Sequence, residues 1–430
     1  MICSLICAAL FAAFAEGERV AFFGDSISQN GYQTFQIQLF QALRHPGKPV
    51  RIENIGTSGD TASGGLDRWD WDAKPYDPET VFVMFGMNDF GLNNWKSVWP
   101  TDAKNAAVRE RSLAAYRTAM TRLVERIGGE GRRVVLLTPT PYDSYRTEEG
   151  KRWNRGADYG LSRCAEIVRA LGREKNIPVI DLHGPLSAFY ATHVDLKLNS
   201  DRIHPGPAGS LLMSTLIWRA LGETNAIGRL ELDARGSGTV SVDYAPNALP
   251  FPDAPEYRMM AEEWPLLREL NREELVVKNL PAGRYALKAN GKGLAECSSE
   301  ELADGVSLAT LETPNLLLAR NAHEVACRLQ RLVEQMRSVR IYAHEAETKG
   351  VDVDDAVQLK AWIDAELKKS ESSPYGSWRR HCLGLLAKHY PARRERNAEL
   401  DGYRAEINAV RPVAWRLEIV PTGLTGARHD

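Results

Sequence analysis

The sequence predicts an α/β fold in which a parallel sheet carries helices on both faces, followed by a second domain that is part β and part α. The first observation behind this prediction is the alternation of strand-like and helical stretches from Glu18 to Leu221. The second is the change of pattern after Gly222, where that regular order ends. The third is length, because 430 residues exceed what one hydrophobic core usually organises.

Five short β-like runs in the first half of the chain are the predicted strands of the sheet. The run at 81–85 is apolar throughout, which is typical of a strand buried on both faces. Helical stretches separate the runs and supply the covering layers. The predicted strands are 20–23, 50–54, 81–85, 133–137 and 178–180, and the predicted helices are 32–44, 104–127, 159–174 and 207–221.

The second half of the chain has a different organisation. Residues 229–244 alternate like antiparallel strands, and Asn290-Gly291 is typical of a hairpin turn. From about Thr313 the apolar spacing becomes helical, with charged residues on the other face. We therefore expect one domain over 18–222 and a second, β-rich and then helical, over 225–430.

The first fifteen residues form an apolar run that ends in Ala13-Phe-Ala15, a pattern typical of a cleaved signal peptide. The run is shorter than the roughly 20 residues that a membrane span needs. We expect cleavage between Ala15 and Glu16 and a secreted or periplasmic protein without a membrane span. No Lys or Arg precedes the run, so an uncleaved anchor or a misassigned start is the alternative.

Charge and cysteine content exclude several classes of function. Lys and Arg number 54 against 56 for Asp and Glu, a formal charge of −2, so no broad positive field is available for nucleic acid. Four cysteines remain after the leader, and none lies in a CxxC pair. Either Cys297 pairs with Cys327 or Cys382, or all four are small buried side chains.

Four short polar motifs lie where such a sheet would place a functional site. They are residues 23–27, 54–61 and 85–89, each directly after a predicted strand, and residues 201–205, before the last helix of the first domain. Loops at the carboxyl ends of parallel strands meet at one edge of the sheet. Each motif alone is weak evidence, since Gly24-Asp-Ser26 can be a plain turn and a single histidine is more often structural.

Together and in this order, the four motifs resemble the SGNH (GDSL-type) hydrolase family. The four signature residues of that family fall on Ser26, Gly59, Asn88 and His204. The resemblance covers about residues 18–222. It implies a three-layer α/β/α catalytic domain with a flavodoxin-like five-stranded parallel sheet, in a secreted esterase whose residues 225–430 are an accessory domain of unknown role.

The resemblance assigns a catalytic triad that agrees with the chemistry of the residues. Ser26 would be the nucleophile, because a hydroxyl needs a nearby base to react at neutral pH. His204 would accept its proton and return it to the leaving alcohol. Asp201, three residues before the histidine, would orient the imidazole ring and stabilise its charged form.

An ester hydrolase also needs hydrogen-bond donors for the oxyanion of the tetrahedral intermediate. Three donors are expected here: the backbone N–H groups of Ser26 and Gly59 and the side-chain amide of Asn88. Asp25 and Asp89 are expected to hold the loops around them. No cofactor and no metal ion is predicted, since no dinucleotide or phosphate-binding motif and no zinc-type histidine spacing occurs.

Four tryptophans follow the second and third motifs, so they either line the rim of the site and stack on sugar rings or pack the loops. Arg202, and Arg68 with it, is close enough in sequence to reach a substrate carboxylate. The candidate substrate-contacting residues are Trp69, Trp71, Trp95, Trp99 and Arg202.

Three functions fit these observations. The first is removal of short acyl groups, above all O-acetyl, from carbohydrate. Export and the additional domain favour it, because family members of that kind often act on polysaccharides. The second is a lipolytic acylhydrolase or thioesterase with the same triad. The third is a glycan-binding protein whose triad is idle.

Overall fold

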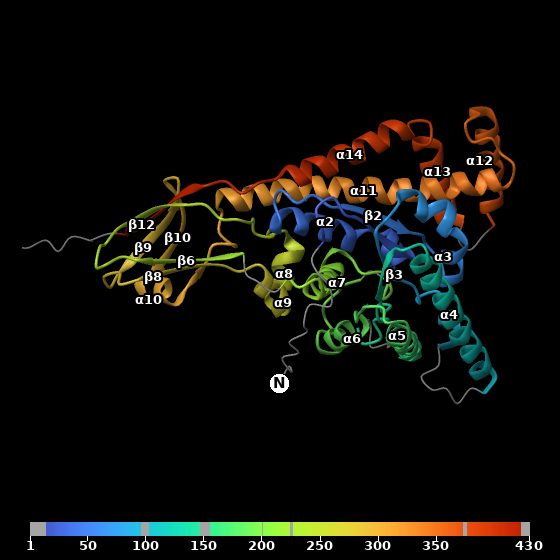
Figure 1. Cartoon of the computed structure of the whole chain (residues 1–430), viewed down its shortest axis with the longest axis horizontal. Coiled ribbons are helices and arrows are strands. Elements are labelled where there is room, and N and C mark those ends of the chain that lie inside the picture. Colours follow the sequence, from blue (N-terminus) through green and yellow to red (C-terminus); the bar gives the residue numbers. More distant parts are fainter. Residues whose placement is uncertain are drawn as a thin grey trace, which may run out of the picture.

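The computed structural model describes residues 14–95, 103–146, 155–199, 201–223, 227–372 and 376–422. Five parallel strands form its central sheet in the order β2-β1-β3-β4-β5, with helices on both sides (Figure 1). The predicted three-layer α/β/α class is therefore confirmed. The strands are β1 (Arg19–Gly24), β2 (Arg51–Gly56), β3 (Thr80–Met84), β4 (Arg133–Leu137) and β5 (Val179–Ile180).

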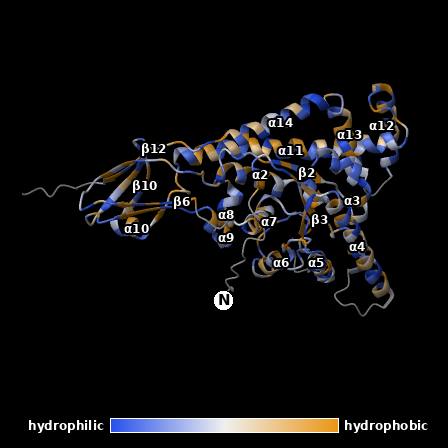
Figure 2. Ribbon diagram, viewed as in Figure 1, coloured by the Kyte–Doolittle hydropathy of each residue, from blue (hydrophilic) through white to orange (hydrophobic). Residues whose placement is uncertain are grey.

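Two groups of helices enclose the sheet. Helix α2 packs against α7, whereas α3 packs on α4 and α4 on α5. Strand β3 is buried along its whole length because both of its faces are covered, and Figure 2 shows the hydrophobic strands at the centre of the molecule. The helices of this part are α1 (Ser26–Gln29), α2 (Tyr32–Arg44), α3 (Ala62–Arg68), α4 (Ala103–Gly129), α5 (Arg155–Lys175), α6 (His183–Thr192) and α7 (Pro207–Ala220), with short turns η1 (Trp69–Ala73), η2 (Lys74–Tyr76) and η3 (Leu92–Trp95).

The register of the neighbouring strands β2, β1 and β3 brings their carboxyl ends to one level. Gly24 at the end of β1 is paired with Gly56 at the end of β2 and with Met84 at the end of β3. The loops that follow these strands carry the first three motifs. They therefore start side by side, as expected at the carboxyl edge of a parallel sheet.

A second, smaller core lies between two further sheets near one end of the molecule. The four-stranded sheet has the order β10-β9-β12-β7 and the three-stranded sheet the order β11-β8-β6. Their inner side chains, such as Leu275, Leu287 and Leu417, pack together. The strands are β6 (Gly228–Asp233), β7 (Val240–Tyr244), β8 (Glu273–Lys278), β9 (Arg284–Ala289), β10 (Lys292–Ser298), β11 (Val306–Ser307) and β12 (Trp415–Pro421), with α10 (Ser299–Asp304) beside them.

The pairing of these strands was only partly foreseeable. The hairpin β9–β10 turns at Asn290-Gly291, where both residues have positive φ angles of 51° and 81°. Strands β6 and β7 do not pair with each other as their alternation suggested. Strand β6 pairs in parallel with β8, and β7 pairs antiparallel with β12. Both partners come from more distant parts of the chain.

The remaining helices return from this sandwich to the central sheet. Helix α11 has 35 residues, about 52 Å at 1.5 Å per residue, and lies beside α14, α2 and β2 (Figure 1). Buried side chains of α11 and α14, including Leu329 and Ile407, belong to the same core as the sheet. The range 225–430 thus has no single core of its own, and its unity as a domain stays a prediction. These helices are α8 (Pro255–Glu263), α9 (Pro265–Leu270), α11 (Pro314–Thr348), α12 (Ala356–Ser370), α13 (Gly376–His389) and α14 (Arg393–Ala409).

A buried ionic cluster fastens α11 to the sheet. The carboxylate of Asp72 is fully buried and contacts Arg337 of α11 at 2.6 Å and Arg68 of α3 at 2.7 Å. Arg340 reaches it at 2.8 Å from a more exposed position. Burial by itself raises the pKa of Asp72, but the three guanidinium groups lower it further, so the net pKa lies well below the ordinary value.

The same cluster holds the ends of the adjacent strands β1 and β2. Arg337 Nε donates to the carbonyl oxygen of Gly56 at 3.0 Å, and its Nη2 to Thr57 Oγ1 at 3.3 Å. Arg68 Nη2 donates to the carbonyl oxygen of Gly24 at 2.9 Å. One charged group, the Asp72 carboxylate, therefore positions the arginines that hold both loops.

The last residues of the predicted leader also enter the core. Phe14 is 5% exposed and lies edge-on to Phe82 and Trp218, with ring centroids 6.1 and 6.3 Å away. Cleavage after Ala15 would remove this side chain. The cleavage site, and the export that depends on it, stay predictions. Within the described residues, no helix is long and apolar enough to cross a bilayer.

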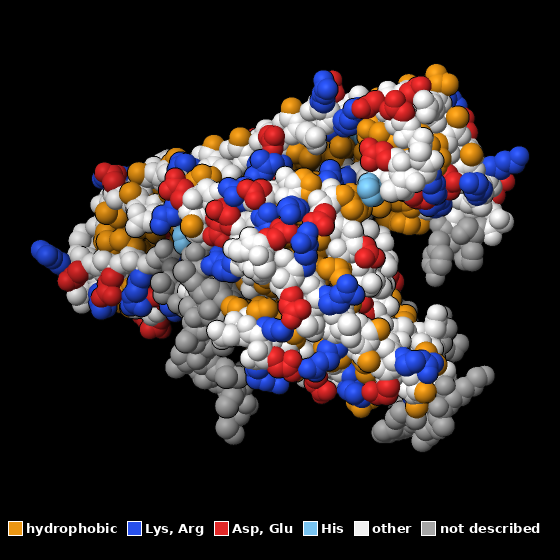
Figure 3. All heavy atoms as spheres, turned by 45° about the vertical axis from the view of Figure 1, so that its right-hand side comes forward, with side chains coloured by type: hydrophobic (Ala, Val, Ile, Leu, Met, Phe, Trp, Pro, Cys, Tyr) orange, Lys and Arg blue, Asp and Glu red, His pale blue; other side chains and the backbone are white. Residues whose placement is uncertain are grey.

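The four cysteines after the leader are free thiols. Cys164, Cys297 and Cys382 are buried and Cys327 is half-buried, as expected of small apolar side chains. On the face seen in Figure 3, positive and negative side chains are interspersed, in keeping with the near-neutral net charge.

Loss of the Arg337 guanidinium should destabilise the fold strongly, because it leaves a buried carboxylate short of a partner. We expect Arg337→Met to lower the free energy of unfolding by about 3–5 kcal/mol. Arg340→Met is the matched control. The Arg340 side chain is 36% exposed, and its loss should cost at most about 1 kcal/mol. Urea unfolding at pH 7 measures both values, and equal losses would contradict the role of the buried pair.

Candidate active site

The first motif places Ser26 at the turn between β1 and α1. Asp25 caps α1, its Oδ1 accepting a hydrogen bond from the backbone N–H of Ile27 at 3.0 Å. A Cβ atom at Gly24 would lie 2.4 Å from the carbonyl oxygen of Met84, so only glycine fits between the two strands. Ser26 consequently begins the helix directly above the sheet edge.

His204 and Asp201 come from the loop before α7 and meet Ser26 across the sheet edge. His204 Nε2 lies 2.8 Å from Ser26 Oγ. On the other side of the ring, Nδ1 lies 2.6 Å from Asp201 Oδ2. The structure thus brings together the three residues that the sequence predicted as a triad, in the order hydroxyl, imidazole, carboxylate.

The environment of Asp201 keeps its carboxylate charged. Partial burial raises its pKa, but hydrogen bonds from the His204 ring and from the backbone N–H groups of Ile203 and His204 lower it further. The net pKa lies well below the ordinary value. An ionised carboxylate in contact with Nδ1 favours a proton on that nitrogen and leaves Nε2 free to accept one from Ser26.

Arg202 supports this loop from the inside, and its predicted contact with substrate stays a prediction. The residue is only 5% exposed. Its guanidinium donates to the carbonyl oxygens of Asp143 at 2.9 Å and Arg146 at 2.8 Å. Its backbone has a positive φ of 72° and donates to Asn199 Oδ1 at 2.8 Å. The side chain therefore holds the 143–146 segment to the loop that carries Asp201 and His204.

The three predicted oxyanion donors lie on the loops that start together at the sheet edge. Gly59 has a positive φ of 77°, a conformation that residues other than glycine rarely adopt. Asn88 is exposed, and its Nδ2 donates to the carbonyl oxygen of Asp60 at 2.8 Å, which leaves one amide hydrogen. In the described part of the chain, no acceptor is found for the backbone N–H of Ser26 or Gly59.

Two aspartates beside these donors have strongly raised pKa values. Burial raises the pKa of Asp25 to about 7, against the hydrogen bond from Ile27 and with a contribution from Asp89. Burial also raises the pKa of Asp89 to about 7. Asp89 Oδ1 accepts a hydrogen bond from the backbone N–H of Ala62 at 2.9 Å. Both carboxyls therefore hold loops, as expected, and their protonation changes near neutral pH.

The tryptophans do not form a rim around Ser26. Trp69 is fully buried against Phe23, and Trp95 is 3% exposed with its Nε1 donating to the carbonyl oxygen of Phe90 at 2.9 Å. Both pack loops, which is the alternative to a substrate contact that the sequence left open. Trp99 lies outside the described residues.

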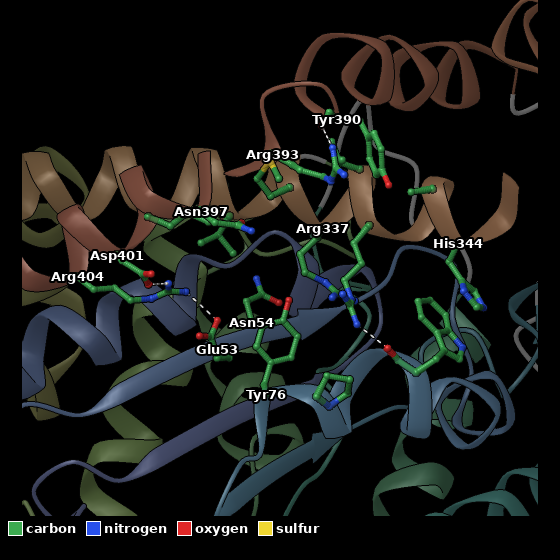
Figure 4. A pocket seen from close by; sticks show the side chains of 18 of the residues that line it. Glu53, Asn54, Tyr76, Arg337, His344, Tyr390, Arg393, Asn397, Asp401 and Arg404 are labelled. Carbon is green, nitrogen blue, oxygen red and sulfur yellow. Dashed lines mark hydrogen bonds and ion pairs between the residues drawn. The ribbon is translucent and has the colours of Figure 1, made fainter. Parts of the chain in front are cut away.

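Trp71 lines a pocket that is separate from the triad. Its ring is stacked on His344 with centroids 3.6 Å apart. The pocket, of about 720 Å³, lies between β2, η1 and η2 on one side and α11 and α14 on the other (Figure 4). Figure 4 shows Arg404 of α14 directed at Glu53 of β2, and the two form an ion pair at 2.7 Å. Neither Ser26 nor His204 lines this pocket.

The sequence analysis missed the residues that support the site. Arg68 was considered only as a substrate contact, and Asp72 and Arg337 were not singled out. Asp72 and Arg337 are 265 positions apart, and no local pattern links them. The charged face of the predicted helix over α11 indicates exposed or paired side chains. It does not show which distant residues pair with them. In the described part of the chain, no group of three or more metal-ligating side chains occurs.

Comparison with known proteins supports the class of the first half of the chain. Residues 22–212 match the GDSL-like lipase/acylhydrolase family, so the predicted resemblance is confirmed over this segment. The protein class that this segment defines is the carboxylic ester hydrolases. An acetylxylan esterase from Geobacillus stearothermophilus is 23% identical over 222 residues, which cover 48% of this chain and 94% of that protein.

A resemblance to a solved structure extends over nearly the whole chain, including its second half. A gut microbial diltiazem-metabolizing enzyme superposes with a TM-score of 0.85 at 22% identity, over 96% of this chain and 99% of the other. The arrangement of the catalytic sheet, β sandwich and returning helices is thus a shared fold.

The pH dependence of stability should report on Asp25. Because its pKa rises from 3.8 to about 7 on folding, the folded state retains a proton that the unfolded chain has lost. Its contribution to stability therefore falls as pH rises from about 4 to about 7, and is constant above. Asp25→Asn still caps α1 but does not ionise, so its stability relative to wild type should rise over that range.

Urea unfolding at pH 5 and pH 8 measures this difference. Asp67→Asn, which removes an exposed carboxyl of α3, is the control and should show no such change. If Asp25→Asn and wild type lose stability in parallel between the two pH values, the raised pKa is contradicted.

Proposed function

We propose that this chain is a serine esterase that removes short acyl groups, principally O-acetyl groups, from carbohydrate. The observation that carries the proposal is the contact of Ser26 Oγ with His204 Nε2 at 2.8 Å, continued by Asp201 at 2.6 Å. This order is the one that nucleophilic ester hydrolysis requires. It occurs inside the segment that matches an acylhydrolase family.

Acylation begins when His204 Nε2 accepts the proton of the Ser26 hydroxyl as its oxygen attacks the ester carbonyl carbon. The carbonyl oxygen becomes an oxyanion. The imidazolium, stabilised by the Asp201 carboxylate, then gives its proton to the leaving alcohol as the ester bond breaks. The products of this step are the free alcohol and an acyl group on Ser26.

Deacylation repeats the same proton transfers with water. His204 accepts a proton from a water molecule, which attacks the acyl carbon and forms a second tetrahedral intermediate. The proton returns to Ser26 Oγ when the intermediate collapses, and the carboxylic acid leaves. The ionised Asp201 supports the imidazolium in both halves of the reaction.

Asn88 is proposed to donate its remaining amide hydrogen to the oxyanion, with the backbone N–H groups of Ser26 and Gly59. Asn88→Ala should lower kcat about 10²–10³-fold, because the donor acts on the intermediate more than on bound substrate. KM should change much less. Steady-state kinetics on an aryl acetate measures both parameters, and a kcat within threefold of wild type would remove Asn88 from the oxyanion site.

Carbohydrate acetate is proposed as the substrate on two grounds. The relative from Geobacillus stearothermophilus is an acetylxylan esterase, although it is only 23% identical. The pocket next to His204 has the polar side chains of Asn30, Lys197 and Glu334 in its lining, and these can bind the hydroxyl groups of a sugar. A lipolytic acylhydrolase or thioesterase would use the same triad and is the competing outcome of the test.

A panel of aryl esters of increasing acyl length, together with acetate release from acetylated xylan, tests the proposal. Wild type should prefer acetate to octanoate, and Ser26→Ala should lose activity by about three orders of magnitude or more. Ser162→Ala on α5 is the matched serine control and should retain activity. Preference for octanoate would favour the lipolytic alternative, and unchanged hydrolysis by Ser26→Ala would exclude the triad.

A further inference from the structure

A pocket of about 390 Å³ opens beside the catalytic histidine, within the size range of small-molecule sites. Its lining includes His204 from the loop before α7, Asn30 at the end of α1 and Tyr32 at the start of α2. Lys197 contributes from the segment before the histidine loop. One further lining residue, Glu334, comes from α11, in the half of the chain that lies outside the hydrolase segment.

Glu334 is held in place but is only partly satisfied. It is half-buried, and in the described part of the chain its one hydrogen-bond donor is Gln330 Nε2, at 3.2 Å. The same Gln330 amide donates to the carbonyl oxygen of Asn30, so it joins both residues to one another across the pocket wall. Burial raises the pKa of Glu334. A carboxylate has room for several donors, so this one retains free acceptor capacity toward the pocket.

The surrounding turns of α11 hold Glu334 against the active-site loops. Gln330, Glu334, Arg337 and Ser338 are three or four residues apart and share one face of the helix. Arg337 holds the loop after β2, as described above. Ser338 Oγ accepts a hydrogen bond from Gln29 Nε2 at 3.1 Å. The face is therefore fixed on both sides of the carboxylate, which is what a binding group needs.

The chemistry of the pocket fits an alcohol that carries further hydroxyl groups. The Glu334 carboxylate can accept hydrogen bonds from two neighbouring hydroxyls, and charged acceptors form the stronger bonds. The Lys197 ammonium, which has no ion-pair partner among the described residues, can donate to hydroxyl or ring oxygens. Tyr32 adds an aromatic side chain against which a sugar ring can lie. A fatty alcohol would leave these polar groups unpaired at a cost.

We propose that Glu334, with Lys197 and Tyr32, forms a subsite for the sugar that leaves as the alcohol, so that α11 completes the active site. This inference rests on the proposed esterase function and names the part of the chain that selects its substrate. Glu334 does not touch the reacting atoms and acts only through binding. It should therefore matter for sugar esters and not for esters without hydroxyl groups.

The experiment compares Glu334→Gln with wild type on two acetates, an O-acetylated monosaccharide and an aryl acetate that lacks hydroxyl groups. Glutamine keeps the length of the side chain and can still accept from Gln330. We expect kcat/KM for the sugar acetate to fall about 10- to 100-fold, mostly through KM. The value for the aryl acetate should stay within about twofold. Glu324→Gln, an exposed acid on the same helix, is the control and should match wild type on both substrates.

Each other result overturns the proposal in a distinguishable way. Equal losses on both acetates would show that Glu334 supports the fold or the triad and does not bind the sugar. No loss on either would exclude the subsite while leaving the esterase function standing. If wild type hydrolyses the aryl acetate but releases no acetate from any acetylated sugar, both the subsite and the carbohydrate assignment are wrong. Thermal unfolding of each variant separates loss of folding from loss of binding.

Discussion

The Asp72 carboxylate is the charge on which the arrangement of the site depends. It is fully buried, and a charge in that position is tolerated only when it is paired and hydrogen-bonded. Arg68 and Arg337 provide the pairing, and each uses its remaining N–H groups to hold the carbonyl oxygen that ends β1 or β2. The loops with Ser26 and Gly59 are therefore fixed by an ionic cluster beneath them, and α11 is part of that cluster.

The catalytic edge itself is built from groups with shifted proton affinities. Asp201 is kept ionised by its hydrogen bonds and lies against the imidazole, where a negative charge stabilises the protonated ring. Asp25 is buried and Asp89 half-buried near it, and desolvation of each carboxyl raises its pKa to about 7. The three aspartates thus have different roles. Asp201 is the charged partner of the imidazole, whereas Asp25 and Asp89 hold loops.

The second half of the chain divides into parts with different relations to the site. The β sandwich has a core of its own, whereas α11 and α14 share the core of the catalytic sheet. Strand β12 follows four helices in the chain and pairs in the sandwich between β9 and β7. The four-stranded sheet therefore combines strands from both sides of these helices in the sequence. The resulting structure makes α11 a wall of the hydrolase part, and a change in that helix reaches the catalytic loops through Arg337 and Gln330.

The sequence by itself determined the parallel sheet, the positions of its strands, and the motifs with Ser26, Gly59, Asn88 and His204. Those features depend on local periodicity and on loops that a parallel sheet must bring to one edge. Burial and long-range pairing were decided only by the tertiary structure. Trp69 and Arg202 turned inward because core contacts and carbonyl groups satisfied them, and strands β6 and β7 paired with distant partners. Asp72 and Arg337 meet across 265 residues, and no short-range pattern can encode such a contact.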